Sequence, residues 1–83
     1  MIKISYDMRR ILKVLLNMKG NIQISNTSNG TLINYTYKDD DIYITKEFDT
    51  NKYEIVQYFE EYSTEINFTT QSSVINYLKN NFQ

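Results

Sequence analysis

Residues 29–48 of the chain read NGTLINYTYKDDDIYITKEF, and apolar and polar side chains alternate twice within them. Alternation with a period of two is typical of a strand that buries one face. The dipeptide Asn29-Gly30 is a strong hairpin signal, and residues 38–41 predict a second turn. Together with a short alternating run at residues 22–25, this stretch predicts a three-stranded antiparallel meander.

The residues before the meander have the periodicity of a helix. Between residues 6 and 19, apolar side chains recur at intervals of three and four, which gives the helix one core-facing side. Ser5 is predicted as the N-cap and Gly20 as the stop after the last turn. The predicted core-facing side comprises Met8, Ile11, Leu12, Leu15 and Met18.

Two more helices are predicted after the meander. Residues 52–62 repeat apolar side chains at helical spacing, and Asn51 followed by Glu54 resembles a capping box. Residues 71–81 predict the last helix, behind a threonine cap at residues 69–70. The predicted inward side chains are Ile55, Val56, Phe59 and Tyr62 in the first of these helices, and Val74, Ile75, Leu78 and Phe82 in the second.

The predicted fold is therefore a single α+β domain over residues 1–83. Its element order is α-β-β-β-α-α, with the three-stranded meander packed against the helices. Residues 63–68 are a predicted linker. Whether residues 64–68 add a fourth strand stays open.

The residue types that are absent exclude several kinds of chemistry. The chain contains neither Cys nor His, which removes disulfides, thiolate metal sites, cysteine nucleophiles and the commonest general base. The contiguous Asp39-Asp40-Asp41 lacks the alternate spacing and the glycine of a calcium loop. A three-stranded sheet in so short a chain leaves little room for a deep pocket. We therefore expect a protein that is not an enzyme, with no catalytic residue, cofactor or metal site.

The sequence also predicts where the protein works. No segment has the roughly 18 consecutive apolar residues of a membrane span. Met1-Ile2-Lys3-Ile4 lacks the apolar region and cleavage site of a signal peptide. Ile, Asn, Tyr and Lys, which have AT-rich codons, are abundant, whereas Ala is absent. We expect a protein of the bacterial cytoplasm with no membrane partner, encoded by a low-GC bacterium or its phage.

The formal net charge of −1 hides an uneven distribution. Residues 1–20 carry five cations against one acid, whereas residues 21–83 carry four lysines against nine acids. Three adjacent aspartates at a turn repel one another, and turn chemistry needs only one, so their presence favours a role in binding a cationic partner. The candidate acidic face comprises Asp39, Asp40, Asp41, Glu54, Glu60 and Glu61.

A basic face is the alternative candidate. Arg9, Arg10 and Lys13 fall within about 100° on a helical wheel, opposite the apolar side of the first predicted helix. Three cations make a sparse footprint for nucleic acid, which usually needs a denser basic stripe. Direct nucleic-acid binding is therefore the less favoured hypothesis.

Three stretches carry a resemblance to a known family: YKDDDIYI at residues 37–44, EIVQYF at 54–59 and EEY at 60–62. With the predicted element order, they resemble the small phage-borne anti-CRISPR proteins, specifically the type II-A inhibitors that mimic the DNA flanking a target. That family has a glycine in the acidic hairpin tip and an acidic start to its last helix, where this chain has aspartates and the neutral residues 69–73. The resemblance implies contact with the flank-reading arginines of a CRISPR effector through Asp39, Asp40, Asp41, Glu60 and Glu61.

These patterns lead to three hypotheses of function. The first is a non-enzymatic phage or mobile-element inhibitor that binds a bacterial CRISPR effector, or another nucleic-acid-handling protein, through the acidic face. The second is a small nucleic-acid-binding regulator that uses Arg9, Arg10 and Lys13. The third is a homo-oligomeric structural or assembly module joined through strand edges or tyrosines. The partner, the mechanism and the oligomeric state, a homodimer included, stay open.

Overall fold

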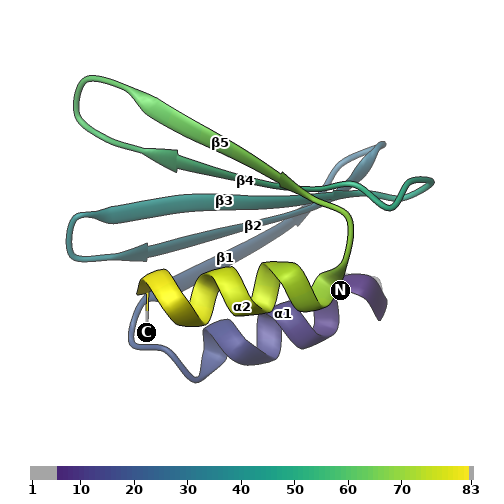
Figure 1. Ribbon diagram of the computed structural model, residues 1–83, viewed down its shortest axis with the longest axis horizontal. Coiled ribbons are helices and arrows are strands. Elements are labelled where there is room, and N and C mark those ends of the chain that lie inside the picture. The colour runs from purple at the N-terminus through teal and green to yellow at the C-terminus, as the bar shows by residue number, and fades with distance from the viewer. Residues whose placement is uncertain (1–5, 83) are drawn as a thin grey trace.

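A five-stranded antiparallel sheet with two helices on one face makes up the α+β fold (Figure 1). The computed structural model describes residues 6–82. The strands follow one another in the sheet in chain order, β1-β2-β3-β4-β5. The elements are α1 (Tyr6–Leu16), β1 (Asn21–Asn26), β2 (Gly30–Tyr37), β3 (Asp40–Glu47), β4 (Tyr53–Tyr58), β5 (Ser63–Phe68) and α2 (Gln71–Phe82).

The three predicted strands are present as β1, β2 and β3, but they belong to a five-stranded sheet and not to a three-stranded meander. Ile33 pairs with Ile24 of β1 on one side and with Ile44 of β3 on the other, so the predicted alternation places all three side chains on the helix-covered face. The turn predicted over residues 38–41 is shorter than expected. Only Lys38 and Asp39 form it, and the next two aspartates already belong to β3.

The prediction of a helix over residues 52–62 is wrong. Residues 53–58 form β4 and residues 63–68 form β5, so the element order is α-β-β-β-β-β-α and the sheet has five strands. Residues 64–68, left open by the sequence, belong to β5. Ile55 pairs with Ile44 of β3 and with Ile66 of β5. This pairing buries Ile55 between two neighbouring strands. It therefore favours a strand over a helix in this segment, in line with the strand preference of its β-branched and aromatic residues.

The core lies between the helices and the covered face of the sheet. Both helices contribute apolar side chains, and β2, β3 and β4 contribute the facing ones. Lys46 is buried in the same layer, and its Nζ donates to the backbone oxygens of Glu47 (2.7 Å) and Thr50 in the β3–β4 loop. The buried hydrophobic residues are Met8, Ile11, Leu15, Ile33, Tyr35, Ile42, Ile44, Tyr53, Ile55, Val74, Ile75 and Leu78.

The ends of the helices agree in part with the predictions. α1 ends at Leu16, three residues before the predicted end, and Gly20 does not have a positive φ. Gly20 is instead required by packing, because a Cβ there would lie 2.5 Å from the backbone oxygen of Thr36 and from the ring of Tyr35. The predicted N-cap Ser5 lies outside the described residues.

The predicted last helix and its threonine cap are confirmed. α2 spans Gln71–Phe82, and the Thr70 Oγ1 accepts a hydrogen bond from the Ser73 backbone N at 3.1 Å. Neither α1 nor α2, which are the helices of residues 6–82, is long and apolar enough to cross a membrane.

Candidate functional site

The face of the sheet that the helices leave uncovered carries only acidic charge at its strand positions. The alternation that points Ile42, Ile44 and Ile55 at the helices points their neighbours to the opposite face. On the five strands, this outward face holds no Lys or Arg. Its charged residues, which we call the acidic sheet face, are Asp41, Glu47, Glu54 and Glu65.

Two of these carboxyl groups interact directly. Glu54 on β4 and Glu65 on β5 are diagonal neighbours, because Glu65 pairs with Val56 and Glu54 pairs with Asn67. A side-chain hydrogen bond with Glu65, followed by partial burial, raises the pKa of Glu54, and Lys52 opposes the rise. A carboxyl group held next to another in this way repels like charge and attracts cationic groups.

The β2–β3 hairpin separates the three adjacent aspartates. Asp39 lies in the turn, while Asp40 and Asp41 point to opposite faces of β3. On the helix-covered face, Gln57 Nε2 lies 3.5 Å from Asp40 Oδ1. On the outward face, Asn34 Nδ2 donates to Asp41 Oδ1 at 2.9 Å. Their mutual repulsion is therefore smaller than the sequence suggested.

The β4–β5 hairpin ends in an exposed aromatic and acidic tip. The Phe59 backbone N donates to the Tyr62 backbone oxygen at 2.8 Å and closes the turn around Glu60 and Glu61. The rings of Phe59 and Tyr62 stack with centroids 4.6 Å apart and an interplanar angle of 19°. These rings are 40% and 63% exposed, and neighbouring Tyr58 is 47% exposed. The hairpin extends away from both helices, which accounts for the exposure of the rings at its tip (Figure 1).

The structure places the predicted acidic residues in two groups. The β2–β3 and β4–β5 hairpins turn at the same end of the sheet (left in Figure 1), so Asp39 lies at the same end as Glu60 and Glu61. Glu54, Glu60 and Glu61 do not lie on one face, because residues 53–58 form a strand and Glu60 and Glu61 lie in the turn that follows it. Glu54 lies instead on the acidic sheet face with Glu65, a residue that was not among the candidates. The alternation of polar and apolar side chains over residues 65–68 is the sequence signal that places Glu65 on the outward face of a strand.

The predicted basic residues lie on the opposite side of the molecule. Arg9, Arg10 and Lys13 are exposed on α1. Arg10 and Lys13 line a shallow groove between the two helices with Lys79 of α2, whereas Arg9 does not line it. Lys79 was not among the sequence candidates, because it lies far away in the chain. The remaining lining residues of this α1–α2 groove are Val14, Asn17 and Ile75.

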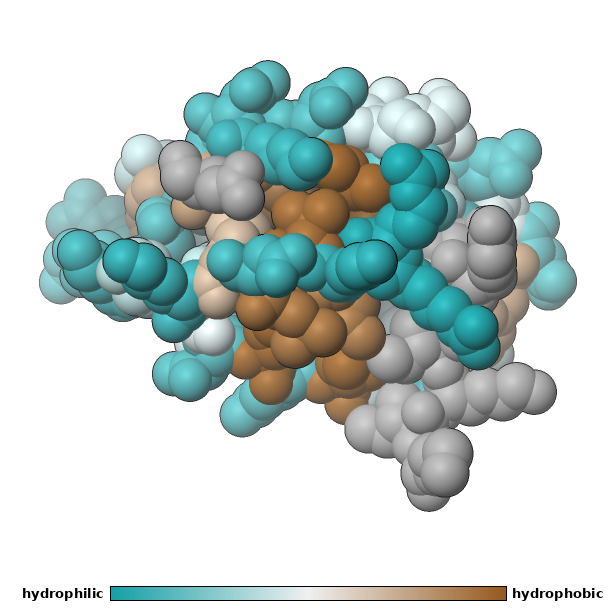
Figure 2. Space-filling model, turned by 90° about the horizontal axis from the view of Figure 1, so that it is seen from below, coloured by the Kyte–Doolittle hydropathy of each residue, from teal (hydrophilic) through white to brown (hydrophobic). Residues whose placement is uncertain are grey.

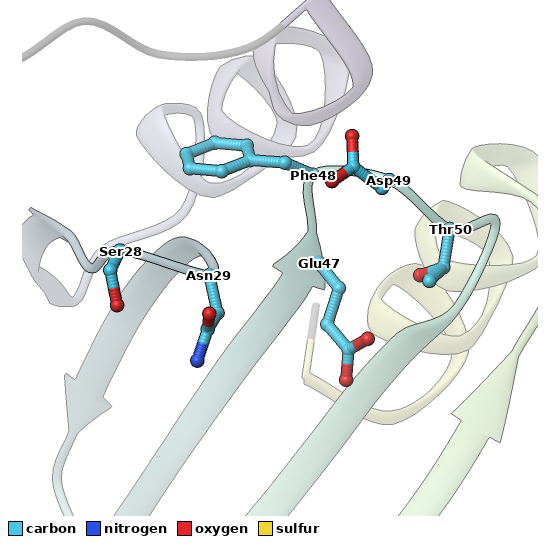
Figure 3. A pocket seen from close by; sticks show the side chains of 6 residues that line it. All are labelled: Ser28, Asn29, Glu47, Phe48, Asp49 and Thr50. Carbon is cyan, nitrogen blue, oxygen red and sulfur yellow. The ribbon is translucent and has the colours of Figure 1, made fainter.

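A further pocket lies at the end of the sheet opposite the acidic hairpins, between the β1–β2 and β3–β4 loops (Figure 3). Ser28, Asn29, Glu47 and Asp49 are among its lining residues. Figure 3 shows that the carboxyl groups of Glu47 and Asp49 point in different directions, so they do not form a pair that faces one bound group. Within residues 6–82, no three acidic side chains are close enough together to bind a metal ion.

Comparison with known proteins identifies no relative of this chain. No protein-family model, curated protein or solved structure matches the chain. The function must therefore be inferred from the surfaces described above.

Proposed function

We propose that this protein is a non-enzymatic, anti-CRISPR-like inhibitor from a phage or mobile element. It binds a bacterial CRISPR effector, or another nucleic-acid-handling protein, at a groove that normally holds nucleic acid. The observation that carries the proposal is the acidic sheet face, in which every charged strand position is a carboxylate. A surface with charge of one sign competes with a polyanion for a cationic groove and accelerates encounter with it.

The exposed aromatic rings beside the acids support a protein partner. Tyr, Phe and Trp are enriched in the centres of protein interfaces, where they fill pockets and exclude water. In this chain, Tyr58, Phe59 and Tyr62 project at the same end of the sheet as Glu60 and Glu61. The acids would steer the encounter and the rings would hold the bound state.

The test uses a guide-loaded type II-A CRISPR effector, with and without its target DNA, and the full chain immobilised on a sensor. We expect binding to the DNA-free effector, loss of binding when target DNA is bound first, and an affinity that falls as salt rises. We expect Glu54→Gln/Glu65→Gln, which removes two charges from the acidic sheet face, to lower the association rate several-fold. Binding that is unaffected by target DNA would contradict competition for the nucleic-acid groove.

The matched control keeps the net charge of that variant but changes another surface. Asn76→Lys/Asn80→Lys adds the same two units of positive charge at exposed positions of α2. It should bind the effector as the wild type does. Equal loss in both variants would mean that net charge, and not the acidic surface, controls association.

A homo-oligomeric assembly module remains the competing function. The observation that supports it is β1, an edge strand whose residues 21–26 carry neither charge nor proline. Charge and proline are the features that usually prevent an edge strand from pairing with another chain. Light scattering over a range of protein concentrations separates the two proposals. A mass of one chain at every concentration would remove the assembly module.

A further inference from the structure

The α1–α2 groove gathers positive charge from two segments that are far apart in the sequence. Arg10 and Lys13 come from α1, and Lys79 comes from the last turn of α2. The two helices lie side by side and run in the same direction, and the Arg10 backbone N of α1 donates to the Oε1 of Gln71, the first residue of α2, at 3.1 Å. Among the residues whose side chains the structure describes, those that line the groove include no acid.

The helix dipoles do not cancel this charge. Lys13 and Lys79 both lie in the last turns of their helices, where each helix end contributes roughly half a negative charge. Three full side-chain charges against about one negative charge from two helix ends leave about two positive charges in the groove. Stabilisation of the helix ends therefore accounts for only part of the charge present.

The shape of the groove suits an extended anion better than a small one. Its volume is about 350 Å³, and it is shallow and open to solvent. Half-buried Val14 supplies apolar surface beside the cations, whereas Ile75 is only 7% exposed and belongs mainly to the core. Figure 2, which views the helical side, shows hydrophobic side chains along the middle of this face with hydrophilic ones around and across them. Alternating phosphate groups and sugar carbons match such a mixture of charge and apolar surface.

We propose that the α1–α2 groove binds the phosphate backbone of a nucleic acid, without reading its bases. Arg10, Lys13 and Lys79 contact phosphates, and Val14 packs against a sugar. This inference goes beyond the proposed function and does not depend on it, because the groove and the acidic sheet face lie on opposite sides of the molecule. If both surfaces work together, the protein contacts an effector with one side and the effector's nucleic acid with the other.

The experiment measures fluorescence anisotropy of labelled single-stranded and duplex oligonucleotides titrated with the full-length protein. We expect a Kd on the order of 10⁻⁵–10⁻⁴ M at low salt, independent of base sequence. Three phosphate contacts predict a slope of log K against log salt of about −2 for single strands and about −3 for duplex. Lys13→Gln/Lys79→Gln should weaken binding at least tenfold at low salt and reduce the slope to about −1.

The control variant removes the same charge elsewhere. Lys19→Gln/Lys52→Gln lies in the α1–β1 and β3–β4 loops and should bind oligonucleotide nearly as the wild type does. Circular dichroism verifies that all variants are folded. The proposal is overturned by no anisotropy change at low salt, by equal losses in the two double variants, or by binding to anionic lipid vesicles or inorganic phosphate without binding to oligonucleotide.

Discussion

At the scale of single residues, Lys38 occupies a backbone conformation that normally belongs to glycine. Its φ is 53°, the left-handed region, at the first position of the two-residue turn between β2 and β3. This chain therefore retains a side chain where glycine would relieve strain, and the Lys38 Nζ lies 5.2 Å from the centre of the Tyr37 ring.

The strain at Lys38 leads to a stability prediction. Lys38→Gly and Lys38→Ala both remove the amino group from the Tyr37 ring, so their difference isolates the backbone. The left-handed conformation costs a non-glycine residue about 1–2 kcal/mol. Glycine avoids this cost, but it raises the entropy of the unfolded chain, which lowers the free energy of unfolding by about 0.4–1 kcal/mol relative to alanine. We expect Lys38→Gly to be the more stable by about 0.5–1 kcal/mol in urea unfolding. The same pair of substitutions at Asp39, whose φ is not positive, should give the reverse order.

The Glu54–Glu65 pair leads to a prediction of pH dependence. Because the pKa of Glu54 is raised in the folded state, the folded protein binds this proton more tightly than the unfolded chain. Stability from this group is present at low pH and is lost as pH rises from the ordinary pKa of 4.5 through the raised folded value. At neutral pH we expect Glu54→Gln to raise the free energy of unfolding by about 0.2–1 kcal/mol, the size of a like-charge cross-strand pair.

Thermal unfolding of wild type and Glu54→Gln across a pH series checks this sign. The gain should shrink as pH falls below the raised pKa, because wild-type Glu54 is then protonated. Glu60→Gln in the exposed β4–β5 turn serves as the control and should give no comparable pH-dependent gain. A constant difference between wild type and Glu54→Gln at all pH values would exclude the carboxyl pair as its cause.

Single residues also mark the limit of sequence reasoning about the site. Asp39, Glu60 and Glu61 were found because adjacent carboxylates stand out in a sequence. Glu65 and Lys79 were missed because each joins its partners only through tertiary structure. No local pattern shows that Lys79 lies across a groove from Lys13.

At the scale of elements, local periodicity predicted those segments in which only one period fits. Residues 30–37 and 40–47 place Ile33, Tyr35, Ile42 and Ile44 at alternate positions, and residues 71–82 repeat apolar side chains at helical spacing behind a threonine cap. Residues 53–58 fit both periods, because Ile55 and Val56 are adjacent and Phe59 follows at helical distance. Residues 53–58 form a strand because β3 offers a free edge with which β4 pairs, and β5 then pairs with the other edge of β4. That tertiary pairing is absent from the local pattern.

The β4–β5 hairpin tip is the element whose removal should affect binding more than folding. Phe59→Ser/Tyr62→Ser removes two rings that stack on each other in solvent, so we expect a loss of stability below about 1 kcal/mol. If the rings anchor the partner, the same variant should bind the effector at least tenfold more weakly, mainly through faster dissociation.

A matched aromatic substitution controls for nonspecific loss of hydrophobic surface. Phe48→Ser removes a ring that is 46% exposed in the β3–β4 loop, at the opposite end of the sheet. Its binding to the effector should equal that of the wild type. A comparable loss in Phe48→Ser would argue against the hairpin tip as the anchor.

At the scale of the whole molecule, charge is separated between two faces although the net charge is only −1. The helical side presents Arg9, Arg10, Lys13 and Lys79, and the other side presents the acidic sheet face. The molecule measures 31 × 24 × 22 Å, so opposite faces are about two Debye lengths apart at 0.1 M salt, where that length is about 10 Å. Each face therefore interacts with a charged surface largely independently of the other.

This separation predicts that the protein binds both kinds of ion-exchange resin at neutral pH and low salt. The sequence pI of about 5.2 alone predicts binding to the anion exchanger only. Arg10→Gln/Lys13→Gln/Lys79→Gln should abolish retention on the cation exchanger and strengthen retention on the anion exchanger. Glu54→Gln/Glu60→Gln/Glu65→Gln should do the opposite. Elution of all three proteins in the order of net charge, with no wild-type retention on the cation exchanger, would show that the two faces do not act separately.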